Sequence, residues 1–261
     1  MRVSDRVVIV TGASSGIGWA TALHLAARGA TVLAAARNVE RLDALAALSD
    51  RITPIRCDVT VDDDRAALVD AAGPHVDVLV NNAGLGYLGA VEGMEAADVR
   101  TLFETNVLAL IDLSQRVLPG MLERGLGHIV NVASVASWVA FPPYSVYAAS
   151  KFAVQGFTEG LRREVIGRGV TAATVNPGPI ATEFYERSAG ATGTGPASTT
   201  SVGPGTGMVA RAITRSIRLR HVPGYQVIAV PRVIGLARVV AVPGVGRLVD
   251  VATLPTRLLG R

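Results

Sequence analysis

The sequence predicts an α/β fold: a doubly wound parallel sheet of about seven strands with helices on both faces, followed by a short helical C-terminal extension. Short β-branched runs alternate with Ala- and Leu-rich stretches over the first two thirds of the chain, which is the pattern of βαβ units. A glycine-rich turn joins the first such run to the first helical stretch. Of the 261 residues 49% are hydrophobic and 18% are charged, which supplies a core and excludes disorder of the whole chain.

Each predicted strand is a short run of small or β-branched apolar residues that ends at a turn, as expected for strands buried on both faces. The first run enters a glycine-rich turn and not a small-residue cleavage site, so it is interpreted as a strand and not as a signal peptide. The strands are expected near Arg6–Val10, Thr31–Ala35, Ile52–Cys57, Asp77–Val80, His128–Val132, Thr171–Val175 and Gln226–Val230.

The stretches between these strands have the length and composition of helices that cover a sheet. No repeat of solenoid length is present. The helices are expected over roughly Gly16–Ala27, Val39–Leu48, Asp62–Ala72, Ala97–Glu123, Tyr147–Arg168 and Gly207–Arg220.

The chain length fits one domain over residues 1–230 with an extension over 231–261 packed on it. Residues 188–207 are almost entirely Gly, Ala, Thr, Ser and Pro, which predicts a mobile loop on the substrate side or a plain linker. In the extension, Pro243 and Pro255 separate apolar pieces, which predicts two short helices on a surface.

Charge is distributed unevenly along the chain. Residues 1–187 carry 16 basic and 20 acidic side chains, whereas residues 188–261 carry nine basic side chains and one acid, Asp250. The tail, at a net +8, is a candidate for contact with a membrane surface, a partner subunit or the substrate cleft. Zinc-ligand spacing and aromatic residues interleaved with basic ones are both missing, so no nucleic acid partner and no metal are expected.

Two further features of composition bear on location and chemistry. The single cysteine, Cys57, favours a reducing, cytoplasmic location, and arginines interrupt the most apolar stretch, so no membrane-spanning helix is expected. Peripheral contact with the inner membrane surface through the tail stays open. Of the 25 basic residues 24 are arginine and one is Lys151, which suggests that the lysine is kept for its chemistry.

The glycine-rich turn is typical of a site for a dinucleotide pyrophosphate. Glycines let the backbone turn tightly and approach the phosphates, which then lie at the positive end of the helix. The alternative is that these glycines only make the turn. The predicted contacts are Gly12, Ser14, Ser15, Gly16, Ile17 and Gly18.

The adenosine end of such a cofactor is expected at the ends of the second and third strands. Ala36 stands where NAD-dependent folds usually offer an acid, and Arg37 follows it, which favours the 2′-phosphate of NADP over NAD. An ordinary exposed arginine is the alternative. Asp58, with Val59 beside it, could take the adenine amino group, or Asp58 could simply make a turn.

Polar residues also follow the fourth and fifth strands, at the sheet edge where ligands bind in such folds. They are Asn82, Ala83 and Gly84 after one strand and Ser134 after the other.

Tyr147 and Lys151 are spaced so that a helix puts them on one face, one turn apart. A phenol with an ordinary pKa near 10 needs a nearby cation to do acid–base work near neutral pH, and Lys151 supplies one. The alternative is a surface pair without function.

Together these motifs resemble those of the short-chain dehydrogenase/reductase family in its single-domain, Rossmann-type form. The resemblance covers roughly residues 6–183: the TGxxxGxG turn, the NNAG tetrapeptide, Asn106 on the long helix, Ser134, YxxxK, and Pro177-Gly178 after the sixth strand. It implies that Tyr147 is the general acid/base, that Ser134 holds the substrate oxygen, and that Lys151 binds the nicotinamide ribose. It also implies a water-mediated proton relay at Asn106, with a structural asparagine as the alternative. Residues of the carboxamide segment would be Pro177, Gly178, Ile180 and Thr182.

The resemblance implies an oxidoreductase that acts on a carbonyl or secondary alcohol with a nicotinamide cofactor, and Arg37 makes NADP(H) the expected one. A homo-oligomer, either dimer or tetramer, is expected. An NAD-dependent alcohol dehydrogenase and a non-catalytic NADP-binding sensor are the alternatives. The loop between Ser134 and Tyr147 crowds Trp138, Phe141 and Tyr144 together, which favours an apolar substrate or packing beneath the loop. His24 and His128 are expected to be structural.

Overall fold

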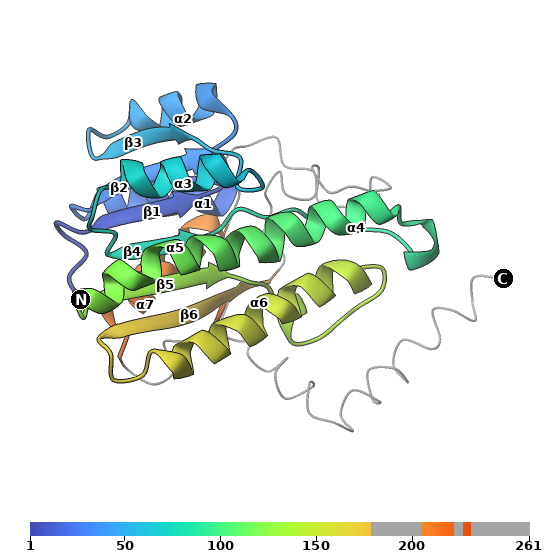
Figure 1. Cartoon of the computed structure of the whole chain (residues 1–261). Coiled ribbons are helices and arrows are strands. Elements are labelled where there is room, and N and C mark those ends of the chain that lie inside the picture. Colours follow the sequence, from blue (N-terminus) through green and yellow to red (C-terminus); the bar gives the residue numbers. More distant parts are fainter. Residues whose placement is uncertain (179–204, 222–226, 231–261) are drawn as a thin grey trace.

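The computed structural model describes residues 1–178, 205–221 and 227–230, and these contain one parallel sheet of seven strands in the order β3-β2-β1-β4-β5-β6-β7 (Figure 1). The predicted doubly wound sheet is confirmed. Its strands are β1 (Val7–Thr11), β2 (Thr31–Ala36), β3 (Ile52–Arg56), β4 (Val78–Asn81), β5 (Gly127–Val132), β6 (Val170–Pro177) and β7 (Val227–Val230).

The helices that follow the strands begin and end within a few residues of the predicted positions. They are α1 (Gly16–Ala26), α2 (Val39–Ala46), α3 (Asp62–Ala71), α4 (Ala96–Phe103), α5 (Ala109–Glu123), α6 (Ser145–Glu164) and α7 (Thr206–Arg218). The long helix predicted over 97–123 is continuous, but a π-helical turn at Glu104–Leu108 divides it into α4 and α5. This turn was not predicted from the sequence.

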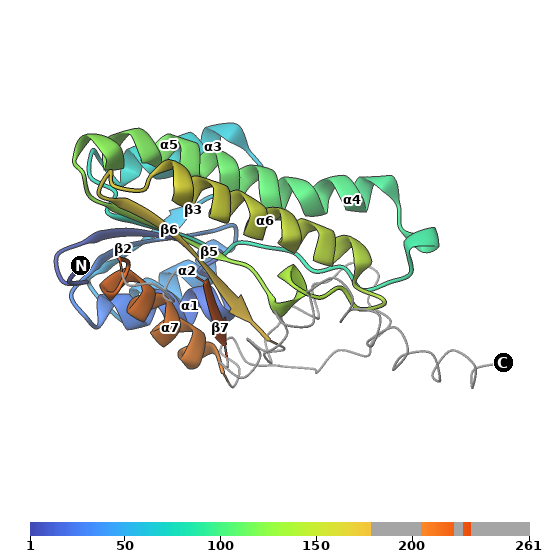
Figure 2. The same cartoon turned by 90° about the horizontal axis from the view of Figure 1, so that it is seen from below.

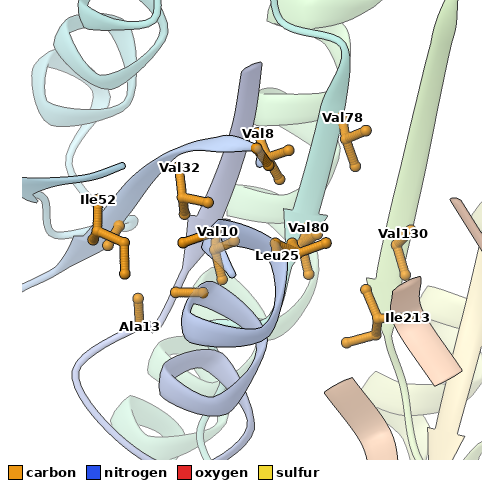
Figure 3. Close-up of a cluster of buried hydrophobic side chains, with 14 of the residues drawn as sticks. Val8, Val10, Ala13, Leu25, Val32, Ile52, Val78, Val80, Val130 and Ile213 are labelled. Carbon is orange, nitrogen blue, oxygen red and sulfur yellow. The ribbon is translucent and has the colours of Figure 1, made fainter. Parts of the chain in front are cut away.

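Two helical layers cover the sheet, one on each face (Figure 2). α1, α2 and α7 pack on one face, with Leu25, Leu42 and Ile213 fully buried against β-strand side chains such as Val8 and Val10 (Figure 3). α3, α5 and α6 pack on the other face, which buries Leu68, Leu113, Leu161 and the intervening strand residue Ile9. Alternate residues of a strand point to opposite faces of the sheet, and helices cover both faces. The residues on each face must therefore be apolar, which explains the continuous valine-rich runs.

α4 and the start of α6 extend beyond the carboxyl ends of the strands (Figure 1). The strand order reverses at β1, which is flanked by β2 on one side and β4 on the other. Open α/β sheets bind ligands at the carboxyl ends of their strands, at such a point of reversal.

Several sequence-based expectations fall on residues outside the described ranges. They include most of the 188–207 loop, of which residues 205–207 are described at the start of α7, and the whole 231–261 extension with its suggested membrane or partner contact. Among the described residues, no helix combines the length and the hydropathy needed to cross a bilayer.

Candidate active site

The glycine-rich turn after β1 and the segment after β4 are fastened to each other by hydrogen bonds. The Asn82 side-chain amide donates to the carbonyl oxygens of Thr11 (2.9 Å) and Gly12 (3.2 Å). The Thr11 hydroxyl accepts from the backbone N–H groups of Asn82 and Ala83, both at 3.0 Å. Asn82 and Ala83 therefore shape the turn from behind, which is a structural role at the predicted cofactor site.

The turn itself has the shape of a phosphate cradle. Gly12 and Gly16 have φ values of 66° and 57°, which strongly favour glycine. A Cβ on Gly18 would collide with the Gly12 carbonyl and lie 2.6 Å from the Asn82 amide nitrogen, so only glycine lets α1 approach the turn this closely. Ser15 makes no side-chain cap, and the first turn of α1 has no acid, so the positive helix terminus is open to an anion. These residues fit a dinucleotide pyrophosphate.

At the other side of the turn, the ends of β2 and β3 bring Arg37 and Asp58 together. An Arg37 guanidinium nitrogen lies 3.8 Å from Asp58 Oδ2, and the Arg37 side chain is 69% exposed. Asp58 Oδ1 accepts from the Thr60 backbone N–H (3.0 Å) and hydroxyl (2.7 Å). Burial raises the pKa of Asp58, but the Thr60 bonds and the charges of Arg37 and Arg56 outweigh it, so the carboxyl pKa lies below its ordinary value.

Tyr147 and Lys151 lie on α6 where it reaches the sheet edge, and both are buried. The Lys151 ammonium donates to the Val132 carbonyl oxygen (3.2 Å) and lies 5.7 Å from the centre of the Tyr147 ring. Burial lowers the pKa of Lys151 to about 8, so the group is mostly a cation at pH 7. Tyr144 packs edge-on against Tyr147 with ring centres 6.3 Å apart. The pair is thus not a surface pair.

Gly84 and Asn106 complete the surroundings of the lysine. A Cβ on Gly84 would lie 3.2 Å from Asn106 Oδ1 and 3.6 Å from Lys151 Nζ, so the three residues meet at one point. The Asn106 side chain accepts from the Leu85 N–H (2.8 Å) and donates to the Leu85 carbonyl (2.9 Å) and the Ser150 hydroxyl (3.1 Å). The amide therefore has the structural bonds that were the alternative to a relay, and it fixes the π-helical turn to the segment after β4.

Ser134 begins a short 3₁₀ turn, Val135–Ser137, directly after β5. Its hydroxyl oxygen accepts from the Ala136 N–H (3.1 Å), and its own N–H donates to the Ser137 hydroxyl (3.3 Å). The bond from Ala136 holds the Ser134 side chain in one orientation, the bond to Ser137 fixes the Ser134 backbone, and the residue is only half-buried. Within the described residues, the Ser134 hydroxyl has no hydrogen-bond acceptor, so its hydrogen is free to donate as far as this part of the chain is concerned.

Sequence comparison gives the site its family. The family model described as short chain dehydrogenase matches residues 6–191, which includes every element from β1 to β6. The chain belongs to this family. The fold, the glycine cradle and the Tyr147–Lys151 pair agree with that membership.

Known short-chain dehydrogenases resemble this one closely in sequence or in structure. Human retinol dehydrogenase 8 is 39% identical over 192 residues, which are 70% of this chain and 62% of that protein. A Burkholderia phymatum enzyme in complex with NAD superposes with a TM-score of 0.78, at 27% identity over 91% of this chain and 93% of that one. A Sphingobium yanoikuyae enzyme in complex with NADPH has a TM-score of 0.76, at 28% identity over 97% and 95%. A nicotinamide dinucleotide is therefore the family's cofactor, but the family alone does not choose between NAD and NADP.

Some residues of this dehydrogenase support the site without having been predicted. Asn81 and Asn131 are register partners on β4 and β5, and the Asn81 amide donates to Asn131 Oδ1 (2.9 Å), whose amide donates to the Thr158 hydroxyl (2.8 Å). This buried chain ties the strand ends to α6. Nothing local in the sequence signals it, because the pairing depends on the strand order.

Arg65 is a second residue that sequence reasoning missed. It is buried and donates to the Val59 carbonyl oxygen (2.8 Å), to Asp112 on α5 (2.6 Å) and to Asp62 (2.9 Å). It fixes the Val59 backbone beside Asp58. Among 24 arginines, no sequence signal marks this one.

The remaining predicted residues divide into described and undescribed positions. Pro177 ends β6 with Gly178 directly after it, whereas Ile180 and Thr182 lie outside the described ranges. His128 is fully buried between the Thr171 and Ser216 hydroxyls (2.7 and 2.9 Å), and burial lowers its pKa to about 3, so it is a neutral structural residue. The described residues contain no cluster of side chains suited to a metal ion.

Proposed function

We propose that this short-chain dehydrogenase is an NADP(H)-dependent oxidoreductase that interconverts an apolar carbonyl compound and its alcohol, with Tyr147 as general acid/base. The observation that carries the proposal is the buried Lys151 ammonium beside the Tyr147 ring, in a niche bounded by Gly84 and Asn106. Among the described residues Lys151 has no carboxylate partner, and a buried charge without one is costly to a fold, so the retention of this lysine favours a chemical role.

The side chains divide the work of a carbonyl reduction. The Tyr147 phenol gives a proton to the substrate oxygen, and the Lys151 cation stabilises the phenolate that forms. The Ser134 hydroxyl, oriented by its cap bonds, donates to the same oxygen. When bound, the nicotinamide supplies the hydride. Burial of Tyr147 and Lys151 keeps water from weakening their electrostatic interaction.

NADP is proposed over NAD because of the end of β2. Ala36 offers no carboxylate to an adenosine ribose, and Arg37 presents an exposed guanidinium immediately after it. A guanidinium can bind a 2′-phosphate with two charge-assisted hydrogen bonds. Relatives that bind NAD and relatives that bind NADPH are both known, so this local chemistry carries the choice.

The apolar substrate is proposed from the loop that precedes α6. In this loop Phe141 is 41% exposed and Trp138 is buried. The Gly89 N–H donates to the Pro143 carbonyl (3.2 Å), which ties the loop to the segment after β4. The similarity to retinol dehydrogenase 8 makes long apolar aldehydes and alcohols of the retinoid type the first substrates to test.

The test is oxidation of NADPH and of NADH by the purified full-length protein against a panel of apolar ketones and aldehydes, retinal included. We expect turnover with NADPH, lost in Tyr147→Phe while NADPH affinity stays near that of the parent. Tight NADPH binding without turnover on any panel member would favour the alternative of a non-catalytic sensor. Higher efficiency with NADH than with NADPH would favour an NAD-dependent alcohol dehydrogenase, and equal efficiency would contradict the NADP preference.

A further inference from the structure

The two oxygens of the Asp58 carboxylate have different partners. Oδ1 accepts two hydrogen bonds from Thr60, one from its N–H (3.0 Å) and one from its hydroxyl (2.7 Å). Oδ2 faces the Arg37 guanidinium at 3.8 Å. Since Oδ1 is occupied by a residue two positions away in its own turn, Oδ2 is the oxygen left for any ligand.

A bound NADP would make two demands on this ion pair. The adenine amino group needs an acceptor, which at this turn is Asp58 Oδ2, and the 2′-phosphate needs the Arg37 guanidinium. Each demand takes one member of the same pair. Arg37 is 69% exposed and makes its described ion pair only with Asp58, so it can turn toward a phosphate without breaking a buried contact.

We propose that Asp58 is a specificity-determining residue that acts through Arg37: its carboxylate holds the guanidinium in the free protein, and a 2′-phosphate takes the guanidinium over and frees Oδ2 for the adenine. This inference rests on the proposed NADP function. It makes recognition of the phosphate and of the adenine one coupled event. A nucleotide without the 2′-phosphate leaves Arg37 on Oδ2, where the adenine amino group must share that oxygen with a cation.

The coupling predicts what neutralising the carboxylate does. Asp58→Asn keeps an oxygen for the Thr60 bonds but releases Arg37, so the guanidinium meets a 2′-phosphate without a competitor. The variant also removes the adenine acceptor, but it does so for a nucleotide with the 2′-phosphate and for one without it, so the comparison of the two isolates the release of Arg37. An exposed ion pair is weak, so the gain in preference for the phosphorylated nucleotide is expected to be about two- to five-fold. It should require Arg37.

The experiment measures binding of 2′,5′-ADP and of 5′-AMP by calorimetry to the full-length parent, Asp58→Asn, Arg37→Ala and the double variant. The quantity compared is the ratio of the two dissociation constants, which isolates the 2′-phosphate. We expect Asp58→Asn to raise the preference for 2′,5′-ADP about two- to five-fold when Arg37 is present and to change it by less than about 1.5-fold in the Arg37→Ala background. Thermal midpoints check that each variant is folded.

Asp64→Asn is the matched control. The Asp64 side chain is exposed to nearly the same extent as that of Asp58 (22% against 24%). Its partners are the Arg56 guanidinium (3.3 Å) and the Asp58 N–H (2.7 Å). An asparagine at position 64 can still accept the hydrogen bond from the Asp58 N–H. It should leave the ratio unchanged.

Three results would overturn the inference in different ways. An equal rise in both backgrounds shows simple repulsion between carboxylate and phosphate and no exchange of Arg37. An unchanged ratio in Asp58→Asn shows no competition at all, and both results leave the NADP proposal intact. A parent that binds 2′,5′-ADP no more tightly than 5′-AMP overturns the NADP preference and this inference together.

Discussion

Each end of the proposed cofactor site contains a cationic side chain, which is buried at one end and exposed to solvent at the other. Lys151 at the nicotinamide end is 5% exposed and held by the Val132 carbonyl oxygen, whereas Arg37 at the adenosine end is 69% exposed and faces Asp58 at 3.8 Å. Burial lowers the pKa of Lys151 to about 8, so the folded protein bears a cost to keep that charge. Arg37 stays hydrated and carries no such cost.

Because of this difference in burial, we expect Lys151 to affect the rate of the reaction and Arg37 to affect the choice of cofactor. A desolvated charge interacts strongly with the group beside it, so changes at Lys151 should alter the rate of reaction by orders of magnitude. A hydrated charge interacts weakly and is screened by salt, so changes at Arg37 should alter which cofactor is preferred without altering the chemical step.

Replacing the buried cation should remove activity while stabilising the fold. Lys151→Met keeps the length of the side chain but leaves the Tyr147 phenolate without its counter-charge, so kcat should fall about 10²- to 10⁴-fold. The same change removes a charge that burial disfavours, so the free energy of unfolding at pH 7 should rise by about 1–3 kcal/mol. Steady-state kinetics and urea unfolding measure the two effects.

Arg163→Met is the control for this change, because it removes a cation whose side chain is 62% exposed on the same helix. It should leave both quantities nearly unchanged. Full turnover in Lys151→Met would contradict the assigned role of the lysine.

Removing the exposed cation should change cofactor choice only. Arg37→Ala is expected to raise the NADPH dissociation constant about 10- to 100-fold, since a bidentate charged contact is lost, and to leave that of NADH nearly constant. At saturating NADPH, kcat should stay within about two-fold of the parent, because Arg37 does not touch the reacting atoms. Fluorescence titration with both cofactors gives the constants.

Arg56→Ala provides the comparison for Arg37, since its side chain is 65% exposed on the neighbouring strand and pairs with Asp64. Its effect on NADPH should be several-fold smaller. If NADPH and NADH respond alike to Arg37→Ala, the NADP assignment is wrong.

The pH dependence should also reveal the buried lysine. The cation is present below pH 8 and is lost as pH rises through its pKa of about 8, so carbonyl reduction by the parent should fall roughly ten-fold per unit above that pH. Because the pKa is lowered in the fold, the unfolded chain binds more protons between about pH 8 and 10.5, and this group adds stability as pH rises across that window. The increase should be absent in Lys151→Met, and an identical pH profile of stability in both proteins would show that Lys151 titrates normally.

Features that depend on neighbouring residues in the sequence were predicted correctly, whereas contacts between residues far apart in the chain were not. The strands were predictable because each is a local run of small or β-branched apolar residues, and the Tyr147–Lys151 face was predictable because a helix brings residues four apart onto one side. The bond between Asn81 and Asn131 was not, because 50 residues separate them and only the strand order makes them neighbours. The role of Arg65 toward Val59 was hidden for another reason, since an arginine-rich chain offers many equivalent candidates.

The Arg37–Asp58 contact lies between these cases. The sequence placed each residue at its strand end and assigned each to a different part of the cofactor, but it did not show that they face each other. That required the parallel pairing of β2 with β3, in which Ala36 and Arg56 are register partners, so that the residues following them share one edge of the sheet. The proposed selectivity thus rests on a geometric relation that neither residue shows alone.

Salt should produce the smallest effect and the one most specific to the exposed end. Both cofactors carry the pyrophosphate, so the ratio of the NADPH and NADH dissociation constants isolates the 2′-phosphate at Arg37. Raising the salt concentration from about 0.05 to about 0.5 M should reduce the preference for NADPH several-fold, because the guanidinium is largely in solvent. Under saturating NADPH, kcat should change by less than about two-fold, since the Tyr147–Lys151 pair is buried away from the ions. A salt-dependent kcat with a constant cofactor ratio would reverse the assignment, placing the screened charge at the chemistry and the protected one at the adenosine.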